Sequence, residues 1–216
     1  MATDTTTTAV PLRWPKDVML FSAAYLLPAI AVAVWTRNGE FVFYSAVMLV
    51  LIAAVSWTHR RSRLSRAVLW GLSLWGFAHM VGGLVPVPES WPTNGPNKVV
   101  YSWWLIPEFL KYDQIVHAFG FYVTTLVCWQ GLCAIVRDIR PGQPLRPTFG
   151  ALLLCAAASQ GFGALNEVIE FAATLLVPST NVGGYVNTGW DLVSNLVGAV
   201  LAAAYLRMFA SRTAAA

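Results

Sequence analysis

Paired polar side chains at helical spacing are the feature of this 216-residue sequence that could carry out chemistry. Three pairs lie within or beside long apolar stretches: Asp113 and His117, Glu167 and Glu170, and Asp191 and Asn195. Residues three or four positions apart share one face of a helix, so the two members of each pair are expected to point the same way. Because an ionisable side chain is costly to hold inside a bilayer, these pairs predict a functional site.

Imidazole and carboxylate groups together are ligands that Zn, Fe or Mn sites use. A second imidazole, His79, lies in the apolar stretch WGFAHMVGGL, and the three pairs supply four carboxylates. These are more ligands than one tetrahedral zinc ion needs. Either two metal ions are bound, or one carboxylate remains free as a general base that acts on a metal-bound water.

The composition places these side chains in a membrane protein. Hydrophobic residues make up 57% of the chain and charged residues only 11%, and the apolar residues form long blocks. A helix of ~20 residues crosses a ~30 Å hydrocarbon core. The blocks near that length are 18–35, 41–57, 67–85, 114–136, 149–177 and 192–209. We therefore predict an all-α, polytopic membrane protein whose six transmembrane helices form a single domain over residues 17–212.

The basic residues predict the orientation of this domain. Of the 14 Lys and Arg residues, all but Arg37, Lys98 and Lys111 fall on the same side as the N-terminus. The positive-inside rule then places both termini in the cytoplasm, with residues 1–16 as a mobile tail and residues 213–216 as a short second tail. The net charge of +4 is explained by this topology and by lipid head groups, so no nucleic-acid partner is expected.

The polar positions of four helices fall at similar depth near their outer ends. At ~1.5 Å per residue, His117 lies ~6 Å below Asp113 and Asn195 lies ~6 Å below Asp191. Glycines occur three or four residues deeper on the same four helices: Gly76, Gly120, Gly163 and Gly198. Small residues let membrane helices approach closely. We expect a bundle that is closed beneath the polar layer and opens outward as a pocket, not a channel.

The outer segment 86–112 is rich in aromatic residues, including Trp91, Tyr101 and Trp104. The interpretation that we favour is an anchor at the level of the lipid head groups. The alternative is a lid over an outward-facing pocket, since long ordered loops often cover sites. In the basic stretch THRRSRLSR, His59 is expected to be a solvated residue at the membrane interface.

Three interpretations of the polar layer compete. It could be a hydrogen-bonded cluster that holds helices together, a relay for protons or ions, or a metal or catalytic site, and we favour the last. For the protein as a whole, the corresponding classes are an enzyme, a small transporter, and an accessory protein that binds lipid without turning it over. The depth of the polar layer, in the outer leaflet and not at the midplane, argues against a transporter.

The motifs YDQIVHAFGF, NEVIEF and NTGWDLVSNLVGA resemble those of the YjdF-like bacterial inner-membrane proteins. More distantly, the order Asp-x-x-x-His, Glu-x-x-polar and Asp-x-x-x-Asn-x-x-Gly is similar to the VanZ-like family, which is associated with teicoplanin resistance. The resemblance covers roughly residues 70 to 205. It implies a multi-pass protein of the bacterial inner membrane that acts on envelope lipids or cell-wall precursors. Asn195 stands where YjdF-like sequences often carry an acid.

Our hypothesis is a metal-dependent hydrolase or transferase that acts on a lipid or lipid-linked envelope substrate, with Zn, Fe or Mn as the cofactor. The candidate metal ligands are His79, Asp113, His117, Glu170 and Asp191. Glu167 would be the general base, and Asn166 and Asn195 would orient ligands or substrate through their amides. Membrane lipids are the expected partners, and the oligomeric state does not follow from the sequence.

Overall fold

The fold is a bundle of six helices, described by a computed structural model for residues 14–94 and 97–213. The predicted tails, at residues 1–13 and 214–216, lie outside the described residues. The helices are α1 (Lys16–Trp35), α2 (Gly39–Ser62), α3 (Arg66–Leu84), α4 (Tyr112–Ile139), α5 (Phe149–Leu176) and α6 (Tyr185–Thr213). All six are long and apolar enough to cross a membrane. They form because no water is present in a bilayer core to pair with backbone N–H and C=O groups, which must therefore be satisfied within each helix.

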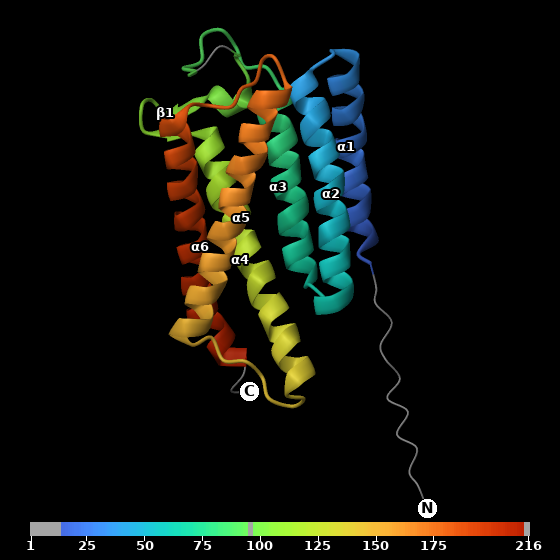
Figure 1. Cartoon of the computed structure of the whole chain (residues 1–216), viewed down its shortest axis with the longest axis vertical. Coiled ribbons are helices and arrows are strands. Elements are labelled where there is room, and N and C mark those ends of the chain that lie inside the picture. Colours follow the sequence, from blue (N-terminus) through green and yellow to red (C-terminus); the bar gives the residue numbers. More distant parts are fainter. Residues whose placement is uncertain (1–13, 95–96, 214–216) are drawn as a thin grey trace, which may run out of the picture.

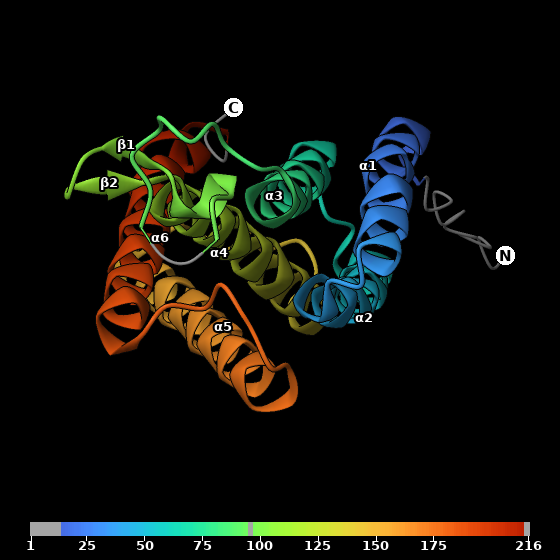
Figure 2. The same ribbon diagram turned by 90° about the horizontal axis from the view of Figure 1, so that it is seen from above.

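The helices run up and down, and α1 begins at the same end of the bundle at which α6 ends (Figure 1). At the opposite end lie the segment between α3 and α4 and the segment between α5 and α6, and we call this the cavity end (Figure 1). Viewed along the bundle, α4 is central, with α5 and α6 on one side and α3 on the other (Figure 2). It packs against α2, α3, α5 and α6. A side chain on α4 can therefore meet groups from several helices.

Two of the four glycines that the sequence analysis named, Gly163 and Gly198, lie where two helices pack closely. Gly198 of α6 lies against the backbone of α4, where an added Cβ would overlap the carbonyl oxygen of Ala118. A Cβ at Gly163 of α5 would lie 2.7 Å from Asn195 Nδ2 of α6. Gly76 and Gly120 instead make room for aromatic rings, those of Tyr25 and Trp75.

The outer segment between α3 and α4 is folded back on itself over the cavity end. It contains a short 3-10 helix, η1 (Val100–Ser102), and a two-stranded antiparallel hairpin of β1 (Trp104–Ile106) and β2 (Leu110–Lys111). An isolated bridge joins Pro86 to Val99, and the rings of Trp91 and Trp103 lie 4.3 Å apart. This small sheet is the one addition to the predicted all-α architecture among the described residues.

Two helix boundaries differ clearly from the prediction. The sixth helix begins at Tyr185, seven residues before the predicted start at position 192, because the polar residues of NTGWD make contacts that no hydropathy window registers. The second helix continues to Ser62, past the predicted end at 57, with a basic last turn that ends at Arg63 in a left-handed conformation with φ 53°.

His59 is not the solvated residue that the sequence predicted. Its side chain is buried, with 4% of its surface exposed. The ring of Trp14, from the segment that precedes α1, packs edge-on against it at 4.8 Å between centroids. The prediction was wrong because the neighbouring arginines point to solvent while this position of the helix faces the rest of the bundle.

Candidate metal-binding site

His117 lies at the centre of a group of carboxylates contributed by three helices. Its side chain is 8% exposed, and its Nε2 atom is 3.6 Å from Asp113 Oδ1, 4.0 Å from Glu170 Oε1 and 4.0 Å from Asp191 Oδ1. Asp113 is on the same helix one turn earlier, whereas Glu170 and Asp191 come from α5 and α6. Those distances are too long for hydrogen bonds. The carboxylates therefore surround Nε2 without direct pairing.

The other nitrogen of the His117 ring is held by an amide. Nδ1 is 3.0 Å from Oδ1 of Asn195, which is fully buried. Because an amide oxygen can only accept, Nδ1 donates this bond, and the neutral ring presents the lone pair of Nε2 to the three carboxylates. Such an arrangement is balanced by a cation at Nε2, either a metal ion or a second proton.

Asp191 is oriented by a polar side chain that the sequence reading did not include. It is fully buried, and its Oδ2 accepts a hydrogen bond of 2.6 Å from Nδ2 of Asn187, while Oδ1 has no partner among the described residues. Asn187 in turn accepts a hydrogen bond from the ammonium group of Lys111, which also lies 3.9 Å from Asp113 Oδ2. The four-residue spacing of Asn187 and Asp191 would have predicted this contact if the sixth helix had been predicted to begin before Asn187.

The two glutamates of α5 have different surroundings. Oε1 of Glu170 accepts a hydrogen bond of 2.9 Å from Nδ2 of Asn166, so the structure places that amide against one of the proposed ligands. The carboxylate oxygens of Glu167 are buried and have no hydrogen-bond partner within 3.5 Å among the described residues. A buried carboxylate of this kind is available to take a proton or to bind a cation.

Two groups of side chains have ligand atoms close enough to share a metal ion. The first is Asp113, His117 and Asp191, and the second is His117, Glu167 and Glu170. Both groups require His117, whose Nδ1 is already bonded to Asn195. The single available nitrogen can bind one ion at a time, so these groups describe one site with a choice of carboxylates, not two sites that are filled together.

The distances from His117 Nε2 to its carboxylates are slightly longer than those between two ligands of one metal ion. Ligand atoms ~2.0–2.2 Å from a zinc ion lie about 3.3–3.6 Å apart at tetrahedral angles. The distances from His117 Nε2 to Asp113, Glu170 and Asp191 are 3.6, 4.0 and 4.0 Å. The carboxylates of either group would have to move inward by a few tenths of an ångström to share an ion with His117.

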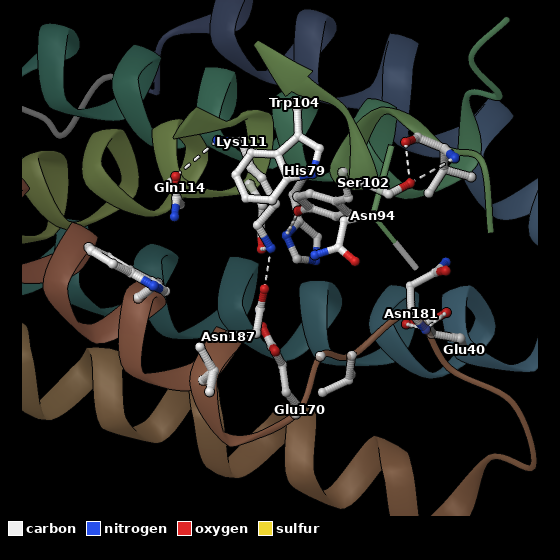
Figure 3. Close-up of a pocket in the computed structure, with 18 of the residues that line it drawn as sticks. Glu40, His79, Asn94, Ser102, Trp104, Lys111, Gln114, Glu170, Asn181 and Asn187 are labelled. Carbon is white, nitrogen blue, oxygen red and sulfur yellow. Dashed lines mark hydrogen bonds and ion pairs between the residues drawn. The ribbon is translucent and has the colours of Figure 1, made fainter. Parts of the chain in front are cut away.

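A cavity of about 640 Å³ lies above this cluster at the cavity end. Asp113 and Glu170 belong both to the cavity wall and to the group around His117. Side chains from the outer segment, including Ser102 and Trp104, complete the wall (Figure 3). The outer segment therefore covers the cavity, which supports the interpretation as a lid that the sequence analysis had placed second.

His79 lines the same cavity but has a different partner. Its Nδ1 is hydrogen-bonded to the hydroxyl of Tyr101, and among the described residues it belongs to neither metal-binding group. Burial, with the Asp113 and Glu170 carboxylates nearby, raises the pKa of Tyr101 well above its ordinary value, so the hydroxyl keeps its proton. Of the five candidate ligands, His79 is the one that the fold keeps apart from the cluster.

Glu40 is a further acidic side chain of the cavity wall that the sequence analysis did not single out. It lies in the first turn of α2. Its carboxylate oxygens accept from the backbone N–H of Asn181 at 2.9 and 3.0 Å. Residues 40 and 181 are too far apart in the chain for any sequence pattern to join them.

Comparison with known families identifies one family for this chain. The family model described as "Predicted membrane protein (DUF2238)" matches residues 18–212. The chain belongs to this family. The match spans all six helices of this DUF2238 protein and every residue of the cluster around His117. No curated protein and no solved structure matches the chain.

Proposed function

We propose that this protein is a metal-dependent hydrolase or transferase of the cytoplasmic membrane of bacteria, with its site facing outward. The observation that carries the proposal is the arrangement at His117, where Asn195 holds Nδ1 and three carboxylates face Nε2 within 4.0 Å. The proposed ligands are His117, Asp113, Glu170 and Asp191. Imidazole with several carboxylates suits Zn, Fe or Mn better than magnesium, which prefers oxygen alone.

Each residue has a role that follows from its surroundings. A bound divalent ion would polarise an ester or phosphoryl oxygen and acidify a water molecule. Glu167, which lies beside the four ligands and is left outside their set, would accept the proton of the attacking water or alcohol. Asn195, Asn166 and Asn187 hold His117, Glu170 and Asp191 in place, as partners of metal ligands generally do.

A lipid or lipid-linked envelope compound is the substrate that we propose. The cavity is reached from the end of a membrane bundle, and its wall combines aromatic side chains with the polar cluster. The resemblance of the motifs to YjdF-like and VanZ-like proteins supports the same class of substrate. The excess of Lys and Arg at the opposite end of the bundle supports an outward-facing cavity.

The test is the metal content of the purified protein, measured by mass spectrometry for the wild type and for His117→Ala, His79→Phe and Glu167→Gln. We expect one equivalent of Zn, Fe or Mn in the wild type and none in His117→Ala. His79→Phe is the matched control, because it removes an imidazole of the same cavity that lies outside the cluster, and it should retain the metal. Well-folded wild type without metal would refute the proposal.

Glu167→Gln separates binding from chemistry. It should keep the metal and lose turnover of labelled lipids in proteoliposomes, by at least the 10²-fold that a general base supplies. Loss of the metal together with turnover would show that Glu167 is a ligand and not the base.

A proton or ion relay is the second candidate. The observation that favours it is the connected series from Lys111 through Asn187 to the buried Asp191, beside His117. Metal-free protein that acidifies the lumen of liposomes, and that loses this activity in His117→Ala, would establish the relay in place of the metal site.

A further inference from the structure

Glu40 is a buried acid without a counter-ion. Only 4% of its surface is exposed, yet no Lys, Arg or His lies within 4.0 Å of its carboxylate among the described residues. Both oxygens converge on one donor, the backbone N–H of Asn181, at 2.9 and 3.0 Å. One N–H leaves most of the acceptor capacity of a carboxylate unused. The remaining capacity is directed to the cavity, whose wall Glu40 forms.

The charges of the cavity wall are separated along its length. Glu40 lies beside Asn181 at one side, whereas Lys111, the only Lys or Arg of the wall among the described residues, lies near Glu170 and Asn187 (Figure 3). Lys111 is held over the ring of Trp104 at 5.7 Å and bonded to Asn187, so it cannot neutralise Glu40. A ligand that bridges the cavity would meet the lone carboxylate of Glu40 at one side and, at the other, Lys111 together with the carboxylates of Asp113 and Glu170 that form part of the metal-binding cluster.

The side of the cavity that holds Glu40 also suits a cation through its aromatic rings. Phe41 and Tyr44 follow Glu40 on α2, and Tyr101 faces them from the outer segment, all in the cavity wall. Aromatic faces attract ammonium groups, most strongly where water is excluded. A buried carboxylate and several rings together make a site for one alkylammonium group. The cavity volume of about 640 Å³ is ample for a phospholipid head group.

We propose that the cavity binds a zwitterionic, amine-bearing phospholipid head group, with the ammonium at Glu40 and the phosphate toward Lys111 and the cluster around His117. This inference deepens the proposed function, on which it rests, by naming the substrate class. Glu40 is the residue that selects the amine. The competing explanation is that Glu40 only anchors the segment at Asn181.

Glu40→Gln distinguishes these two explanations. Glutamine keeps an oxygen that can accept from the Asn181 N–H and loses the charge, so an anchoring role would survive and amine selection would not. Glu89→Gln is the matched control, because Glu89 is an exposed acid of the outer segment that pairs with Lys98. Both variants should unfold at the temperature of the wild type.

The experiment is native mass spectrometry of delipidated, full-length protein in detergent with EDTA. The protein is titrated with phosphatidylethanolamine, N-acetylated phosphatidylethanolamine and phosphatidylglycerol. We expect the first to bind about tenfold more tightly than the other two, as one charge-assisted contact provides. Glu40→Gln should abolish the preference and Glu89→Gln should retain it. Soluble phosphoethanolamine in excess should compete, because the discriminating contacts are all with the head group.

Equal affinity of the wild type for the three lipids would overturn the inference, as would a preference that persists in Glu40→Gln or a failure of phosphoethanolamine to compete. Because the titration is done without metal, it does not depend on whether the His117 cluster binds an ion. A chain that contains metal as purified but does not prefer the amine lipid refutes this inference alone, and a chain that prefers the amine lipid but contains no metal as purified refutes only the proposed enzyme.

Discussion

Replacement of Gly198 by alanine tests whether the approach of α4 and α6 holds the site together. A Cβ at this position would overlap the carbonyl oxygen of Ala118 and would lie 2.8 Å from its carbonyl carbon and 2.9 Å from the backbone nitrogen of Tyr122. All three are backbone atoms, so no side chain can rotate away. The two helices must separate, and Asn195, one turn from Gly198, would move away from His117.

The size of the effect follows from this geometry. Overpacking of a well-packed contact costs typically about 1–3 kcal/mol. For a chain of this length, each kcal/mol lowers the melting temperature by roughly 2–4 °C. Gly198→Ala should therefore melt about 2–12 °C below the wild type. By helix propensity alone, alanine would stabilise the helix by up to about 1 kcal/mol relative to glycine. A measured loss of stability would therefore come from the contact between the helices and not from helix propensity.

The assay is thermal unfolding in detergent together with metal content. Gly189→Ala is the matched control on the same helix, because no atom lies within 4 Å of its added Cβ. The control should be at least as stable as the wild type, whereas Gly198→Ala should lose both stability and metal. If Gly198→Ala melts with the control and keeps its metal, the contact between these helices does not position His117 and Asn195.

Three further predictions address the supports of the site and its orientation. Asn187→Leu removes the amide between Lys111 and Asp191 and should weaken metal affinity about 10–100-fold in a chelator titration; the melting temperature should also fall, because the buried Asp191 loses its hydrogen bond. Ser159→Ala removes the buried bond of 3.1 Å from α5 to the Phe121 carbonyl of α4 and should cost about 0.6–1.7 kcal/mol of unfolding free energy. In a chain without native cysteines, Ser90→Cys should react with an impermeant thiol reagent added to intact cells and Gln143→Cys should not; the reverse pattern would invert the proposed orientation.

Much of the cluster could be predicted from the sequence because helix geometry is local. Asp113 and His117 had to share a face of one helix, and Asp191 and Asn195 a face of another, once each segment was assigned as helical. The apolar blocks also predicted that these pairs lie at similar depth. The structure adds that Nδ1 of His117 meets Asn195 and that Nε2 meets Asp113, Glu170 and Asp191.

Other parts of the site could not be predicted in the same way. His79 was grouped with His117 by depth, yet its ring faces Tyr101. Depth is one coordinate of a position in a bundle, and the rotation of α3 about its axis is another, which hydropathy does not report. Asn187 was missed because the helix that carries it starts earlier than its apolar part.

The sequence by itself determined that this chain is a six-helix membrane protein with a polar layer on four helices, because the cost of exposing backbone and charge to lipid acts on each segment separately. Only the tertiary structure decided which of those polar groups meet. Glu40 and Asn181, 141 positions apart, and Lys111 and Asn187, 76 apart, come together through the packing of whole helices. That packing depends on the shapes of facing side chains, which no local pattern records.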